Sequence, residues 1–166
     1  MVILGIDPGI ARVGWGVIKD EYGKQKALDY GCFETSPRIN LEDRLTSIYD
    51  FIIDLIEKLT PEVLAVEQLY FAANSKTALI VGEARGVILL AASKSNIPTA
   101  SYTPLQVKQA LTGYGRADKN QIQSMVGSIL HLFKKITQDD AADALAIAIT
   151  HACSYKMRKV SQYKLK

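Results

Sequence analysis

Cysteine, long apolar runs and a targeting segment are scarce or missing in this sequence. Its only cysteines, Cys32 and Cys153, are far apart and match no metal-binding spacing. No stretch approaches the roughly 18 continuous apolar residues of a membrane span, since Asp143 interrupts the alanine-rich segment 141–149. Met1 is not followed by a basic and then apolar secretory signal. We therefore expect a cytosolic protein outside the membrane, with reduced thiols that have no assigned function.

The composition is that of an ordinary globular domain. A chain of 166 residues, 48% of them hydrophobic, is long enough to bury a core without disulfide or metal support. We expect one domain over residues 1–155, followed by a flexible tail at 156–166 that has five lysines and arginines and no acid. The net charge of +3 comes from this tail, so charge alone does not establish nucleic-acid binding.

Apolar periodicity predicts the order of strands and helices. Three strands separated by turn residues suggest an antiparallel meander, and a helix capped by Asn40 follows. Beyond this helix, strands alternate with helices, which predicts an α/β fold with a mixed five-stranded sheet flanked by helices. The predicted strands are 2–7, 13–19, 26–33, 63–67 and 97–103, and the predicted helices are 41–59, 75–93, 104–111, 119–132 and 141–155.

Two acids stand at the ends of apolar strands. Asp7 ends the first strand and Glu67 ends the fourth, and ligands in such sheets often bind at the carboxyl ends of the strands. Removing a carboxylate from water is unfavourable unless an Arg, a Lys, backbone amides or a cation compensates its charge. Either acid alone is explained by a cap or an ion pair, but the two together indicate a site.

A second pair of acids lies at the start of the last predicted helix. Asp140 and Asp143 are three residues apart, so both project from one helix face near the positively polarised N-terminus. An N-capping role accounts for Asp139 or Asp140. It accounts less well for Asp143, which interrupts small residues that predict close packing.

The four acids together suggest metal chemistry. Clustered carboxylates repel one another unless oxygen-seeking cations such as Mg²⁺ bind among them. Two such ions about 3.5 to 4 Å apart would bind a phosphodiester and catalyse its hydrolysis. That the acids converge in space is an expectation from where the strands and the helix are placed.

Several segments carry a family resemblance, in the same order from about residue 2 to residue 155. The sequence resembles the RuvC family, which has a ribonuclease H-like fold. The resemblance assigns catalysis and metal binding to Asp7, Glu67, Asp140 and Asp143. Asp139 remains open as an alternative to Asp140, although the spacing Asp-Ala-Ala-Asp favours Asp140. The segments that carry the resemblance are Ile3 to Gly9, Val66 to Gln68, Gly82 to Val87 and Asp140 to His151.

The resemblance also implies a substrate and partners. The family acts as a homodimer that makes paired symmetric nicks in four-way DNA (Holliday) junctions during recombination and repair, using Mg²⁺ or Mn²⁺. Gly82 and Gly86 are one helical turn apart, which allows close backbone approach, either within the chain or across the family's dimer interface. A branch-migration complex remains an open partner.

Three further residues match DNA-contacting positions of the family. Tyr70 corresponds to an aromatic residue that stacks on opened bases, and the alternative is that Tyr70 or Phe71 covers the core. Lys108 and Lys119 correspond to basic residues that contact the DNA backbone in the family. Without the resemblance, they do not stand out from Lys76 or Arg116.

Three other functions compete with this one. Actin-like ATPases and sugar kinases begin with a similar strand, turn and hairpin, but they need a second domain, and this sequence has no Gly-rich P-loop. A nuclease acting on structured RNA could use the same acids. A junction-binding module without catalysis would be favoured by a missing acid, whereas all four are present.

Overall fold

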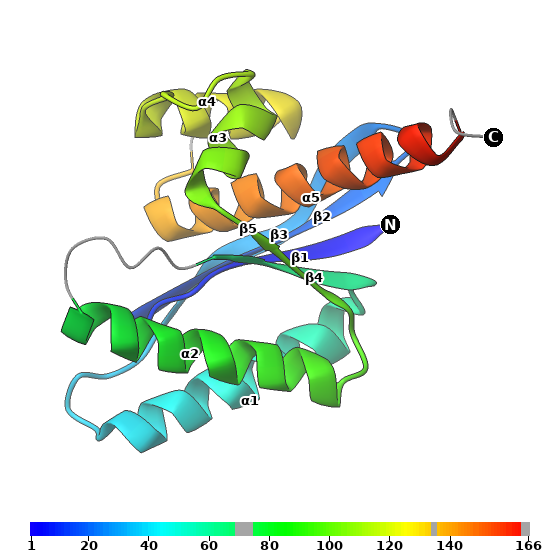
Figure 1. The fold of residues 1–166 in the computed structure, drawn as a ribbon. Coiled ribbons are helices and arrows are strands. Elements are labelled where there is room, and N and C mark those ends of the chain that lie inside the picture. The colour runs from blue at the N-terminus through cyan, green and yellow to red at the C-terminus, as the bar shows by residue number, and fades with distance from the viewer. Residues whose placement is uncertain (69–74, 134–135, 164–166) are drawn as a thin grey trace.

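One mixed sheet organises the chain. In the computed structural model, residues 1–68, 75–133 and 136–163 are described, and their five strands have the order β3-β2-β1-β4-β5 (Figure 1). The first three strands are antiparallel, whereas β4 and β5 run parallel to β1. The α/β class and the mixed five-stranded sheet predicted from the sequence are therefore confirmed. The strands are β1 (Val2–Asp7), β2 (Arg12–Glu21), β3 (Lys24–Glu34), β4 (Val63–Glu67) and β5 (Thr99–Tyr102).

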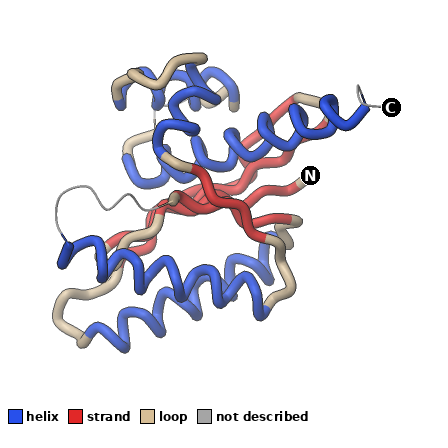
Figure 2. The backbone as a smooth tube through the Cα atoms, in the orientation of Figure 1, coloured by secondary structure: helices blue, strands red, loops and turns tan. Residues whose placement is uncertain are grey.

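Helices cover both faces of the sheet, as Figure 2 shows. α1 (Leu41–Leu59) and α2 (Ser75–Lys94) lie on one face, and α5 (Asp139–Tyr163) crosses the other. α3 (Pro104–Thr112) and α4 (Lys119–Ile129) pack against α5 (Figure 1). None of the described helices is both long and apolar enough to cross a bilayer.

The central strand β1 is buried on both faces, which explains its continuous apolar sequence. Leu4 and Ile6 pack against α1 through Ile52, while Ile3 and Leu145 of α5 belong to the core on the opposite face. All five side chains are 0% exposed. Each contributes roughly 1.5 to 3 kcal/mol of hydrophobic stabilisation. Burial on both faces therefore anchors β1, the strand that ends in Asp7.

Helix α5 lies directly on the backbone of β1 and β2. A Cβ atom on Gly5 would come within 2.1 Å of the Ala144 carbonyl oxygen, and one on Gly14 within 2.0 Å of the Asp140 carbonyl oxygen. Alanines line the facing side of α5. The close packing predicted for this alanine-rich segment is confirmed, and it fixes the first turn of α5 beside the end of β1.

The five helices begin within two residues of the predicted positions, whereas α4 ends at Ile129 and not at the predicted residue 132. Asn40 caps α1 by accepting a hydrogen bond from the Asp43 amide at 2.7 Å, as predicted. α5 was expected at 141–155, but it begins at Asp139 and continues to Tyr163, across the predicted start of the tail. No Gly or Pro interrupts residues 156–163, so nothing in the sequence ends the helix at Tyr155.

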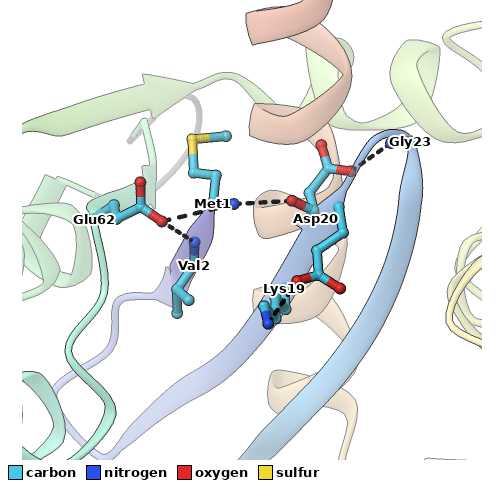
Figure 3. A network of polar contacts seen from close by, with 7 residues as sticks. Met1, Val2, Lys19, Asp20, Gly23 and Glu62 are labelled. Carbon is cyan, nitrogen blue, oxygen red and sulfur yellow. Dashed lines mark hydrogen bonds and ion pairs between the residues drawn. The ribbon is translucent and has the colours of Figure 1, made fainter.

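A polar network ties the strands together at the amino end of β1 (Figure 3). The Met1 amino group donates to the Asp20 carbonyl oxygen at 2.9 Å and lies 3.6 Å from a Glu62 carboxylate oxygen. The same Glu62 oxygen accepts from the Val2 amide at 2.8 Å. This end of β1 is thus fixed to β2 on one side and to the approach to β4 on the other, far along the strand from Asp7.

The contact between α5 and β1 leads to a stability prediction. Gly5→Ala would force a Cβ into the Ala144 carbonyl, so the free energy of unfolding should fall by at least about 1 to 3 kcal/mol. Gly127→Ala in α4 is the matched control, because nothing lies within 4 Å of its Cβ position. It should raise the free energy of unfolding by about 0.5 to 1 kcal/mol. Urea unfolding measures both, and equal stability of the two variants would contradict the close approach.

Candidate active site

Two acids meet at the carboxyl ends of neighbouring parallel strands. In the β1–β4 ladder Ile6 pairs with Val66, so Asp7 and Glu67 follow side by side at the same sheet edge. Their side chains share a hydrogen bond, in which one carboxyl must be protonated to act as donor. The structure thus brings these two sequence-predicted residues together.

The first turn of α5 supplies the other two acids. Asp140 and Asp143 are 27% and 37% exposed, and both raise the pKa of Asp7 through their charge. Asp139, by contrast, is 59% exposed and faces α4, where its carboxylate accepts from the Gln123 amide at 2.7 Å. Asp140 thus acts on Asp7, whereas Asp139 acts on Asp143, whose pKa it raises.

Mutual repulsion and burial make Asp7 the most perturbed of these acids. Burial, followed by the charges of Glu67, Asp143 and Asp140, raises the pKa of Asp7 to about 8. The pKa of Glu67 is also raised, first by burial and then by Asp143. The Asp7 carboxyl is therefore the hydrogen-bond donor to Glu67 near neutral pH. The site holds more negative charge than the chain itself compensates.

Lys119 partly compensates this charge. Its Nζ lies 3.2 Å from Asp139 Oδ2 and 3.5 Å from Asp143 Oδ2. Burial opposes the charge of Lys119, but the two acids outweigh it and raise the lysine pKa. Asp118 caps α4 in a reciprocal capping box with Gln121, which sets Lys119 at the first helical position. The predicted DNA-contacting lysine is thus part of the acidic site.

One cleft joins the acids to both predicted lysines. It has a volume of about 230 Å³, and its charged lining residues are Glu67, Asp143, Lys108 and Lys119. Apolar side chains of α3, α4 and α5 complete its wall. Tyr70, the remaining predicted contact, lies outside the described residues. The cleft thus combines carboxylates with ammonium groups.

Sequence reasoning missed two neighbours of Asp140. Arg12 Nε lies 3.1 Å from Asp140 Oδ2, and Cys32 Sγ lies 3.7 Å from the same oxygen. Burial and then Asp140 raise the pKa of the Cys32 thiol to about 11, so it stays protonated. The antiparallel register, which pairs Gly14 with both Asp7 and Cys32, is the signal that would have placed β2 and β3 beside the acids.

The donor set fits a hard divalent cation such as Mg²⁺. Carboxylate oxygens are the ligands that such ions prefer, and burial followed by three neighbouring acids raises the pKa of Asp7. Among the described residues, no three acid, histidine or cysteine side chains are already gathered as a metal cluster. The acids are held instead by Arg12, by Lys119 and by the Asp7–Glu67 hydrogen bond. Asp7, Glu67, Asp140 and Asp143 are the residues that would hold the ions.

The sheet order, the strand-end acids and the acid pair on the last helix define a ribonuclease H-like nuclease. Residues 3–151 match the family described as Crossover junction endodeoxyribonuclease RuvC. A protein of that name from Moorella thermoacetica is similar to this chain, with 55% identity over 152 residues that cover 92% of this chain and 91% of the relative. The chain belongs to the RuvC family.

Solved structures agree with this assignment. The Thermus thermophilus RuvC structure has a TM-score of 0.87 and 38% identity, covering 95% of this chain and 96% of that one. A second structure, of T. thermophilus RuvC in complex with Holliday junction substrate, has a TM-score of 0.87 and 37% identity over the same shares. The ribonuclease H-like fold expected from the resemblance is therefore confirmed.

The raised pKa of Asp7 predicts a pH-dependent stability in the absence of divalent cations. The native state keeps the Asp7 proton up to about pH 8, whereas the unfolded chain releases it near the ordinary value of 3.8. The free energy of unfolding should therefore fall as pH rises between these values. Asp7→Asn should remove this loss, which is on the order of a few kcal/mol in the free energy of unfolding.

Urea unfolding in EDTA at about pH 5 and pH 9 tests this. Asp54→Asn is the control, since Asp54 is exposed on α1. Wild type and Asp54→Asn should lose stability together, while Asp7→Asn gains relative to both at the higher pH. Parallel behaviour of all three proteins would show that Asp7 is not the group responsible.

Proposed function

We propose that this chain resolves four-way DNA junctions by metal-dependent phosphodiester hydrolysis, in the cytoplasm, during recombination and repair. The observation that carries the proposal is the cleft that Glu67 and Asp143 line together with Lys108 and Lys119. Membership of the RuvC family supports a crossover junction as substrate. So does the T. thermophilus relative, which has been solved with a Holliday junction.

The four carboxylates would hold the catalytic ions. Asp7, Glu67, Asp140 and Asp143 offer only oxygen ligands, which suits two Mg²⁺ ions, with Mn²⁺ as a substitute. Bound ions of this kind supply an activated water and stabilise the leaving oxygen of the phosphodiester. Asp7 must first release its proton, because its pKa of about 8 keeps it neutral near pH 7.

The lysines and one aromatic residue would position the DNA. Lys108 and Lys119 line the cleft beside the acids, where their ammonium groups can contact backbone phosphates. Tyr70, which follows Glu67 in the sequence, is proposed to stack on an opened base at the crossover. Phosphate contacts set the register of the strand, so these residues would place one phosphodiester at the acids.

A homodimer would produce the paired nicks. Leu79 and Leu90 of α2 are 64% and 51% exposed, and a Cβ on Gly86 would meet nothing within 4 Å. This apolar and open side of α2 suits packing against a second copy. A two-fold axis would present two equivalent clefts to two symmetry-related strands. A branch-migration complex is a further partner in this proposal.

A cleavage experiment tests the function. A mobile four-way junction and a linear duplex of equivalent sequence are incubated with the protein in Mg²⁺, and nicks are mapped on every strand. Paired symmetric nicks confined to the junction are expected, with none in EDTA. Asp7→Asn and Glu67→Gln should abolish cutting while junction binding remains, because they remove cation ligands and leave the basic surface intact.

Asp54→Asn is the matched control, because it removes one carboxylate from α1, on the face of the sheet opposite α5. This variant should cut junctions like wild type. If a folded wild-type dimer cut no junction in Mg²⁺ or Mn²⁺, the proposal would be wrong. Cleavage of a structured RNA by the same preparation would then identify the substrate class. Loss of binding together with cutting in Asp7→Asn would contradict the role given to this acid.

A further inference from the structure

Arg12 forms an ion pair with an acid of the proposed metal site. Its Nε lies 3.1 Å from Asp140 Oδ2, and the two side chains are 62% and 27% exposed. The other ion-paired base of the site, Lys119, contacts Asp139 and Asp143 instead. Two positively charged side chains therefore contact the acids. Arg12 contacts Asp140, and Lys119 contacts Asp139 and Asp143.

The backbone in front of Arg12 is firmly held. The Ile10 carbonyl oxygen accepts hydrogen bonds from Thr35 Oγ1 and, at 3.1 Å, from Arg44 Nη2. The Ala11 carbonyl oxygen accepts from the Thr35 amide at 3.1 Å. This clamp joins the loop after Asp7 to β3 and α1. Arg12 thus starts β2 from a fixed position even though its side chain is largely exposed.

Asp140 is held equally firmly from the opposite side. Its carbonyl oxygen lies where Gly14 would carry a Cβ atom, so the first turn of α5 packs directly on the backbone of β2. Its Oδ2 atom also lies 3.7 Å from Cys32 Sγ on β3. The ion pair therefore joins two backbone segments, one hydrogen-bonded to its neighbours and the other packed on β2.

We propose that Arg12 is a positioning residue for Asp140, whose guanidinium holds this carboxylate in the absence of a divalent cation and competes with the cation for it. The inference rests on the proposed role of Asp140 as a cation ligand. A guanidinium N–H and a divalent cation need the same carboxylate lone pairs. An exposed pair of this kind is weak, so Arg12 orients Asp140 without blocking the site.

Cation affinity in the absence of DNA tests the competition directly. Mn²⁺ is titrated calorimetrically into wild type, Arg12→Gln and Arg12→Lys, with Arg38→Gln as a control for loss of an exposed arginine. Arg12→Gln should bind Mn²⁺ about two- to five-fold more tightly, which is the scale of an exposed ion pair. Arg12→Lys keeps the charge but loses the directional guanidinium contact, so its affinity should fall between the two. Arg38→Gln should match wild type.

Two outcomes would overturn the inference. Equal Mn²⁺ affinity of Arg12→Gln and wild type would mean that the ion pair has no hold on Asp140. Tighter binding by Arg12→Gln with Arg12→Lys unchanged would show a distant charge effect instead of a contact. The fluorescence of Trp15, the only tryptophan, confirms that each variant is folded.

Asp140→Asn separates this inference from the proposed function. If this variant bound Mn²⁺ as tightly as wild type, the ligand role of Asp140 would be wrong, and the role of Arg12 would fall with it. If Asp140→Asn lost Mn²⁺ affinity while Arg12→Gln gained none, only the role of Arg12 would be wrong. Both results are obtained without a junction and without cleavage.

Discussion

The close approach of α5 to the backbone of β1 and β2 at Gly5 and Gly14 is the constraint on which the site depends. Gly5 and Gly14 leave room for the helix backbone, and the alanines of α5 fill that room without forcing the layers apart. The first turn of α5 consequently lies beside the ends of β1 and β4. Acids that are more than seventy residues apart in sequence, Glu67 and Asp143, thereby come close enough for the charge of Asp143 to raise the pKa of Glu67.

Bringing these acids together opposes folding, and the chain limits the cost in three ways. Asp7 stays protonated and donates to Glu67, Lys119 faces Asp143, and Arg12 faces Asp140. Each arrangement is reversible, because a proton or a half-exposed ion pair gives way to a better ligand. The site is thus kept stable by contacts that do not compete strongly with its function.

The sequence is informative where one residue determines one contact. The apolar strands ending in Asp7 and Glu67, the cap at Asn40 and the alanines of α5 are each visible in the sequence, because local periodicity and spacing determine them. Arg12 and Cys32 could not be found in this way. Their approach to Asp140 depends on the hairpin register and on α5 crossing that hairpin, which are long-range properties. The end of α5 was also missed, since no helix breaker marks it.

The acids and the lysines of the cleft lie on different elements of the fold. Its acids belong to the sheet and to the buried helix, whereas its lysines stand on α3 and α4, two short helices that carry their own capping boxes and pack against α5. Evolution can therefore remodel the lysine-bearing wall through surface residues of two small helices while the acids stay in register. In the proposed function, the helices that contact DNA would thus be largely separate from the elements that hold the cations.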